Sequence, residues 1–157
     1  MNDLILARAV HVLAVVIWIG GVSMLTTVVL PALRRGELGE DRRRIFEAIE
    51  RRFVWQARVA VLLVGATGLY LVAQLGLWAR FRTLHFWWMH AMVGVWLIFA
   101  LALFVVEPLG VRRHLHRGGG AASEAVFTRL LRAHVVLLAL ALVTIVSAVA
   151  GSHGWIF

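Results

Sequence analysis

Residues 7–35 read ARAVHVLAVVIWIGGVSMLTTVVLPALRR, and this stretch decides the class of fold. Its apolar run is long enough to form a helix that crosses a bilayer, and the run ends at Pro31 and two arginines. A single histidine, His11, lies near its start. Because a polar side chain within lipid is costly and usually functional, the search for a site begins with a partner for this imidazole.

Composition places the chain among membrane proteins. Of its 157 residues, 62% are hydrophobic, whereas soluble domains contain about 45–50%. The absence of cysteine excludes disulfides, thiolate zinc sites, iron–sulfur clusters and covalently attached c-type haem. All sixteen basic residues are arginines, which excludes any site that needs a lysine.

Four apolar runs are each long enough to span a bilayer, at about residues 4–30, 54–77, 86–106 and 130–150. The connections are short, with loops at 31–53 and 107–129 and a tight link at 78–85. Short links between consecutive spans favour antiparallel neighbours. The sequence therefore predicts an all-α fold, a four-helix up-down bundle that forms a single transmembrane domain over residues 1–157.

The arginines predict the orientation of the bundle. Thirteen of them lie in or beside the two longer loops, and Arg8, Arg80 and Arg82 lie on the other side. Arginine-rich loops face the cytoplasm, so both termini are expected to face outward. The net charge of +8 is explained by this topology signal, and no nucleic-acid partner is expected.

Two histidines are expected at similar depth near the outer face, His11 on the first span and His90 on the third. Two imidazoles from two helices can ligate a haem iron from both faces, and a cysteine-free apolar bundle suits haem b. Glycines allow close approach of helices or of a flat ring. The predicted cofactor-binding residues are His11, His90, Gly94 and Trp18, with Arg8, Arg80 and Arg82 as partners for the haem propionates.

Other interpretations of the histidines stay open. A membrane histidine can bond a neighbouring helix, bind copper or relay protons. If the expected depths are wrong by a turn, His85 or His153 becomes a metal ligand instead. His134 is expected near the cytoplasmic end of the fourth span, where a hydrogen-bonded or proton-conducting role is favoured over metal ligation. Small residues on the second span, Gly65, Thr67 and Gly68, predict a helix-contact face, and Glu107 is expected to pair with Arg112 or Arg113.

Several motifs carry a resemblance to known families. The segments AVH at 9–11, VVIWIGG at 15–21 and VLPALRR at 29–35 resemble the copper resistance protein D-like (CopD-like) membrane family, as do RRF at 51–53 and TGLYL at 67–71. The resemblance implies a polytopic protein of the bacterial inner membrane with a site near the outer face. Copper handling and b-type haem both occur among such proteins.

The chain is also similar to HemJ-type protoporphyrinogen oxidases, small four-helix haem proteins with a histidine on helix 1 and a His-x-Lys motif on helix 3. The corresponding residues here are His90, Ala91 and Met92. Since the lysine is missing, the resemblance bears on the haem site more than on the oxidase activity.

Together these patterns predict a b-type haem protein for electron transfer near the outer face. Because the chain is too small for a separate catalytic domain, a redox partner protein or quinone is expected, with a homo- or hetero-oligomer as a further possibility. The alternatives are copper binding or transport and protoporphyrinogen oxidation.

Overall fold

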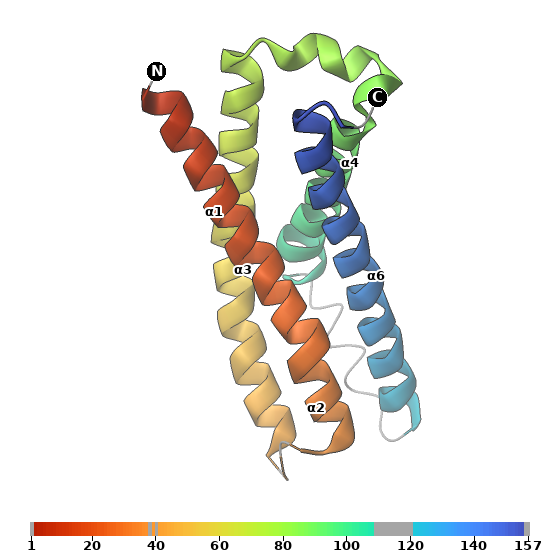
Figure 1. Cartoon of the computed structure of the whole chain (residues 1–157). Coiled ribbons are helices and arrows are strands. Elements are labelled where there is room, and N and C mark those ends of the chain that lie inside the picture. The colour runs from red at the N-terminus through yellow and green to blue at the C-terminus, as the bar shows by residue number, and fades with distance from the viewer. Residues whose placement is uncertain (1, 38, 40, 109–120, 156–157) are drawn as a thin grey trace.

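The structure is a computed structural model that describes residues 2–37, 39, 41–108 and 121–155. Every regular element in this part of the chain is helical, and none of it is a strand (Figure 1). Four helical stretches are long and apolar enough to cross a membrane, namely Asn2–Arg35, Arg44–Gln74, Leu84–Val106 and Leu131–Ser152. The all-α class and the four predicted spans are therefore confirmed, and they indicate a multi-pass membrane protein.

The first helix is longer than predicted. It passes without a break from α1 (Asn2–Met24) through a π-helical turn, η1 (Leu25–Val29), into α2 (Leu30–Arg35). Pro31 does not end the helix but lies in the first turn of α2, where its missing N–H is tolerated. Just before it, the Leu30 N–H bonds the carbonyl of Leu25, five residues back, so the wider turn accommodates the proline.

The predicted loop at 31–53 is helical in most of its length, because the second helix, α3 (Arg42–Gln74), begins twelve residues before residue 54. The apolar residues Ile45, Phe46 and Ile49 predict this amphipathic extension from the sequence, and the structure contains it. Only a turn near Gly36, which has a positive φ of 76°, separates it from α2. The early helical turns are stabilised by a small core in which Phe46 packs with Leu25, Val29 and Leu30. Burial of these apolar side chains outweighs the arginines on the same helix.

The chain crosses one end of the bundle before it enters the second half. Two short 3₁₀ segments, η2 (Leu77–Arg82) and η3 (Leu84–Phe86), form an arch drawn in green that leads from α3 to α4 (Trp87–Leu101) (Figure 1). A second π-helical turn, η4 (Ala102–Val106), follows α4. The last helix, α6, runs from Ala121 to Ser152, and most of the predicted 107–129 loop lies outside the described residues.

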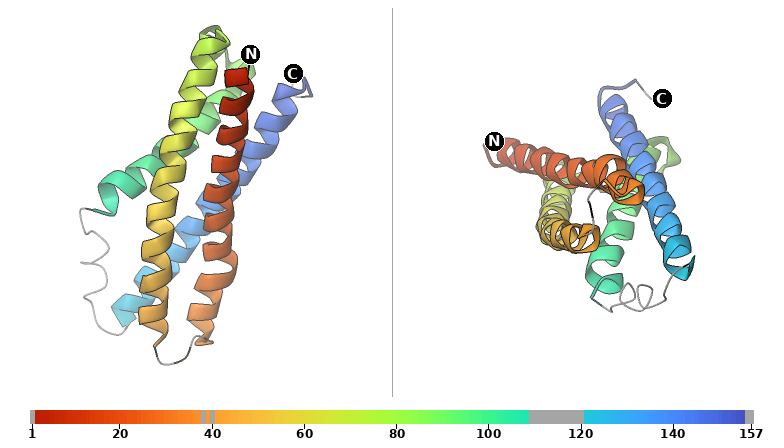
Figure 2. Two further views of the ribbon diagram at one scale, coloured as in Figure 1. Left: turned by 90° about the vertical axis from the view of Figure 1, so that its left-hand side faces the viewer. Right: turned by 90° about the horizontal axis from the view of Figure 1, so that it is seen from below.

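The helices pack mainly as two pairs, α1 with α3 and α4 with α6, which the views in Figure 2 separate. Where the helices meet, glycines leave room for aromatic rings of the neighbouring helix. A Cβ on Gly65 would lie 2.6 Å from the Trp96 ring, and one on Gly151 would lie 2.6 Å from Trp88. The Trp96 indole also donates a 2.8 Å hydrogen bond to the carbonyl of Val61, which joins α4 to α3.

The main buried core lies towards the middle of the bundle. It contains Ala14, Trp18, Ile19 and Val22 of α1, together with Ala57, Ala60, Val61 and Val64 of α3, Phe99 of α4, and Leu138 and Ala141 of α6. Beyond Ala14 and Val64, towards the termini, the facing residues of α1 and α3 are only partly buried. Many large apolar side chains point outward instead, which suits a lipid environment.

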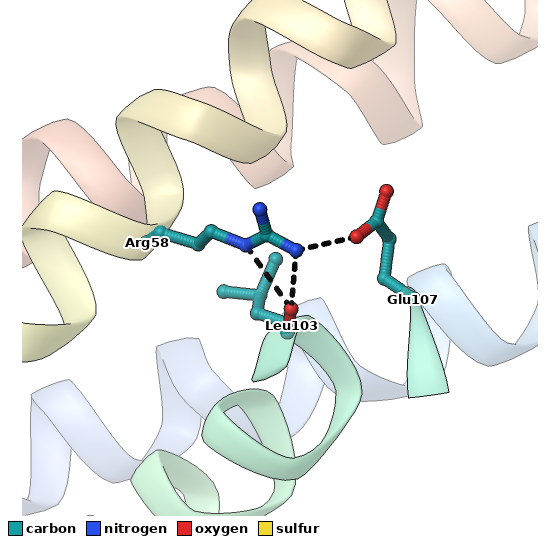
Figure 3. A network of polar contacts seen from close by, with 3 residues as sticks. All are labelled: Arg58, Leu103 and Glu107. Atoms are coloured by element: carbon teal, nitrogen blue, oxygen red, sulfur yellow. Dashed lines mark hydrogen bonds and ion pairs between the residues drawn. The ribbon is translucent and has the colours of Figure 1, made fainter. Parts of the chain in front are cut away.

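Arg58 on α3 joins the end of the third span to the second (Figure 3). In η4 the Glu107 N–H bonds the carbonyl of Ala102, so the carbonyl of Leu103 loses the donor that an α-helix would supply. The Arg58 guanidinium donates to that Leu103 oxygen from Nε at 3.2 Å and from Nη2 at 3.1 Å. The same Nη2 forms an ion pair with the Glu107 carboxylate at 2.5 Å.

This pairing differs from the partner expected for Glu107. Arg112 and Arg113 lie outside the described residues, whereas Arg58, distant in sequence, lies in contact with Glu107. Arg58 also lies over the Phe104 ring, 5.9 Å from its centroid. One guanidinium therefore satisfies a free carbonyl and a carboxylate, where polar groups left without partners are costly.

We predict that Arg58→Leu destabilises the folded protein by about 1–3 kcal/mol, because the Leu103 carbonyl and the Glu107 carboxylate both lose their donor. Glu107→Gln should cost less, since an amide oxygen still accepts from Arg58. Unfolding of the purified protein in detergent measures both effects. Arg52→Leu, an exposed arginine on the same helix, is the matched control, and an equal loss in that variant would contradict the assigned role of Arg58.

Candidate functional site

His11 lies on α1 one turn beyond the buried core, and its half-buried ring faces α3. Its Nδ1 is 2.9 Å from the hydroxyl oxygen of Thr67. Gly68 makes room for the ring, because a Cβ on that glycine would lie 3.2 Å from Cε1 of the histidine. The predicted helix-contact face on the second span therefore surrounds this imidazole.

The hydrogen bonds of Thr67 determine which nitrogen of His11 carries the proton. The Thr67 hydroxyl donates to the carbonyl of Leu63, one turn earlier on α3, at 2.5 Å. Since a hydroxyl has a single hydrogen, its oxygen then accepts from Nδ1–H of His11. In the neutral ring Nε2 is consequently unprotonated, with its lone pair available to a metal or a donor.

Trp18 lies two turns below His11 on α1 and is only 3% exposed. Its ring meets Phe99 of α4 edge to face, with 4.9 Å between the centroids. Its indole nitrogen Nε1 is buried and has no hydrogen-bond partner among the residues that the structure describes. The buried core that includes Trp18 therefore forms an apolar floor below His11, and the Trp18 indole carries one donor without a partner among the described residues.

His90 lies elsewhere. Its ring is exposed at the start of α4, with Nε2 3.1 Å from the carbonyl of Phe81 and Nδ1 3.3 Å from that of Phe86. A neutral imidazole has one N–H, so it donates to only one of these oxygens at a time. The Phe81 ring packs against the imidazole, with 5.4 Å between centroids.

The stripe of α4 that carries His90 faces away from the core. Leu97 and Leu101, on the same side of the helix, are 46% and 56% exposed, and a Cβ on Gly94 would meet no atom within 4 Å. In the described arrangement the His90 stripe therefore does not face the buried core. Because α4 is apolar on all sides, its hydrophobicity alone does not identify its inner face.

The remaining candidates are spread over the surface. Arg80 lies over the Phe86 ring at 4.9 Å, and His85 packs against Phe86 with 4.9 Å between centroids. His153 bonds the carbonyl of Val149 on its own helix at 2.8 Å. Of the others, Arg8 and Arg82 are exposed, and His134 is half-buried on α6.

The described residues form no cluster of three or more His, Cys, Asp or Glu side chains that could hold a metal ion. For haem, the residues present fit one nitrogen ligand, Nε2 of His11, above an apolar floor. They do not form a sandwich between His11 and His90 in the described arrangement. His90 as a ligand thus stays a prediction from the sequence.

Comparisons with known protein families, curated proteins and solved structures find no match to this chain. The resemblances to CopD-like proteins and to HemJ-type oxidases therefore stay predictions. The class of protein rests on the four spans, and the site rests on the geometry around His11.

Sequence reasoning found His11, Thr67 and Gly68 but did not pair them. Counting residues from the ends of the two spans would have placed them at one level, since α1 and α3 are adjacent. The signal that was overlooked is the threonine itself, because a hydroxyl on a helix-contact face is a natural acceptor for a membrane histidine.

We predict that His11 and Thr67 are energetically coupled. A double-mutant cycle with His11→Ala and Thr67→Val should give an interaction energy of about 0.5–1.5 kcal/mol, the range of hydrogen bonds between membrane helices. Thr27→Val is the matched control, because the Thr27 hydroxyl bonds only the Ser23 carbonyl of its own helix. Coupling of His11 to Thr27 of the same size would refute the specific pair.

Proposed function

We propose that this chain is a b-type haem-binding protein of the bacterial inner membrane, in which His11 would hold the haem and the group would supply electron-transfer chemistry towards a membrane partner. The observation that carries the proposal is the hydrogen bond from Nδ1 of His11 to Thr67. A histidine that ligates a metal commonly donates its other ring N–H to a neighbour, which holds the ring and raises its basicity.

A purely structural histidine would make the same bond between helices, so the hydrogen bond alone does not separate the two roles. Two further features favour ligation. Nε2 lies in a membrane-spanning segment, where a polar atom needs a partner, and a metal would supply one. The facing residues of α1 and α3 beyond the core, on the side of His11 towards the termini, are only partly buried.

The chain's own residues have simple tasks in this proposal. Thr67 orients the imidazole, Gly68 leaves space for it, and Trp18 with Phe99 keeps water from the floor of the site. The haem, when bound, supplies the one-electron chemistry. Because the four spans account for most of the described residues, we infer that a redox protein or quinone completes the reaction.

The proposed orientation in the membrane is based on the distribution of the arginines between its two sides. The turn between α2 and α3 and the connection before α6 would face the cytoplasm, and the four spans would alternate in direction. Both termini and the η2–η3 arch would then face outward. In Figure 1 the two termini lie towards the same end, which is consistent with this arrangement. His11, nine residues from the start of α1, would lie in the outer half of the bilayer.

The test of the proposal is an optical spectrum of the purified protein, oxidised and then reduced, with haem counted by the pyridine haemochrome method. We expect a Soret band in the wild type and its loss in both His11→Ala and His11→Asn. The asparagine variant keeps a donor for Thr67 but cannot ligate iron, so it separates ligation from helix pairing. Thr67→Val should weaken haem binding about 10- to 100-fold.

His153→Ala is the control, because this exposed histidine bonds only its own helix end. If His11→Asn keeps the haem content of the wild type, His11 is a structural residue and the proposal fails. A protein that lacks a Soret band but contains copper would instead support the copper-binding alternative.

A separate variant tests the second ligand. Since the His90 ring is exposed and faces two carbonyl oxygens, we expect His90→Ala to retain the haem content of the wild type. The reduced spectrum and the haem count measure this directly. Loss of haem, or conversion of a sharp low-spin α band to a high-spin spectrum, would show that His90 is the second axial ligand and that α4 turns to present it.

A further inference from the structure

A groove of about 610 Å³ runs along the half of α1 nearer the N-terminus. It extends from Leu4 to Val16 and is closed on one side by Leu75, where α3 ends. The lining is apolar apart from Arg8, and the small side chain of Ala9 leaves the groove open at its centre. His11 does not line it, so the groove is separate from the site described above.

The length of the groove matches one leaflet of a bilayer. Leu4 and Val16 are twelve residues apart, which on an α-helix corresponds to about 18 Å. Half of the hydrocarbon core of a bilayer is about 15 Å thick. An acyl chain that lies along this side of α1 would therefore follow the groove for most of its length.

Arg8 places a positive charge near the end of the groove that points towards the N-terminus. Its side chain is exposed and forms no ion pair with any residue that the structure describes. The acidic residue that precedes it on α1, Asp3, lies five positions away and thus about 140° around the helix. Because arginine side chains extend towards the headgroups, this guanidinium is free to pair with a phosphate.

We propose that the groove binds one anionic phospholipid, with its phosphate on Arg8 and one acyl chain along Ala9 and Val16. The charge of Arg8 selects the headgroup, and the apolar walls hold the chain. Neither His11 nor Thr67 contributes to the groove, so the proposal does not rest on His11 as a haem ligand.

Native mass spectrometry of the full chain in a neutral detergent tests the proposal, with phosphatidylglycerol and phosphatidylcholine added at equal concentrations. We expect the wild type to retain one phosphatidylglycerol with a preference of about fivefold, the effect of one basic side chain near an anionic headgroup. Arg8→Gln should reduce the preference to about one. Ala9→Phe, which fills the groove and keeps the charge, should prevent retention of either lipid.

Arg82→Gln is the matched control, because Arg82 is another exposed arginine that does not line the groove. It should keep the wild-type preference. Equal retention of both lipids by the wild type would overturn the proposal, as would an Arg82→Gln effect as large as that of Arg8→Gln. Displacement of the lipid by millimolar inorganic phosphate would also overturn the proposal, because a free anion would then bind at Arg8 without an acyl chain.

Discussion

The backbone carbonyl of Leu103 shows the constraint on which this bundle depends. Within a membrane protein, a carbonyl without a donor cannot turn to bulk water, so every departure from the α-helix needs a substitute partner. The π-helical turn at η4 creates such a carbonyl, and Arg58 of α3 supplies the donor. The same guanidinium pairs with Glu107. The irregular turn and the ion pair are therefore parts of one structure, and together they attach the end of the third span to the second.

The first helix meets the same constraint differently. Pro31 has no N–H to donate, and the π-helical turn of η1 directly before it widens the backbone so that the helix continues into α2. The hydroxyls of Thr26 and Thr27 donate hydrogen bonds to carbonyls of their own helix, at 2.7 and 2.8 Å. A helix of 34 residues results, about 50 Å long and so longer than the hydrocarbon core. Its excess length packs against Phe46 at the arginine-rich end.

The spans could be predicted from the sequence because hydropathy and length report directly on compatibility with lipid. The ends of the helices could not be predicted in the same way, because a helix continues through polar residues wherever one of its faces is buried, as at Phe46. The partner of Glu107 was missed because the nearby arginines in sequence were the simpler choice, whereas Arg58 is brought in by the fold. At the candidate site, the depth of each residue could be counted along its helix from the sequence. The side of the helix on which that residue faces the bundle could not be deduced in this way. Because α4 is apolar on all sides, its sequence does not show which side faces the bundle. The exposed position of His90 could therefore be found only from the structure.

The second span, α3, carries the specific contacts of both halves of the molecule. Arg58 holds the end of η4, Val61 accepts from Trp96, and Thr67 holds His11. Arg58 and Val61 lie about 60° apart around the helix, whereas Thr67 lies about 180° from Arg58, so different sides of this one helix meet α4 and α1. The contacts near Arg58 and Val61 lie within or beside the buried core, whereas Thr67 lies just beyond it. His11 is thus held by α3 at the edge of the buried core. That position is consistent with the proposed ligand role, because the hydrogen bond to Thr67 fixes the orientation of the ring.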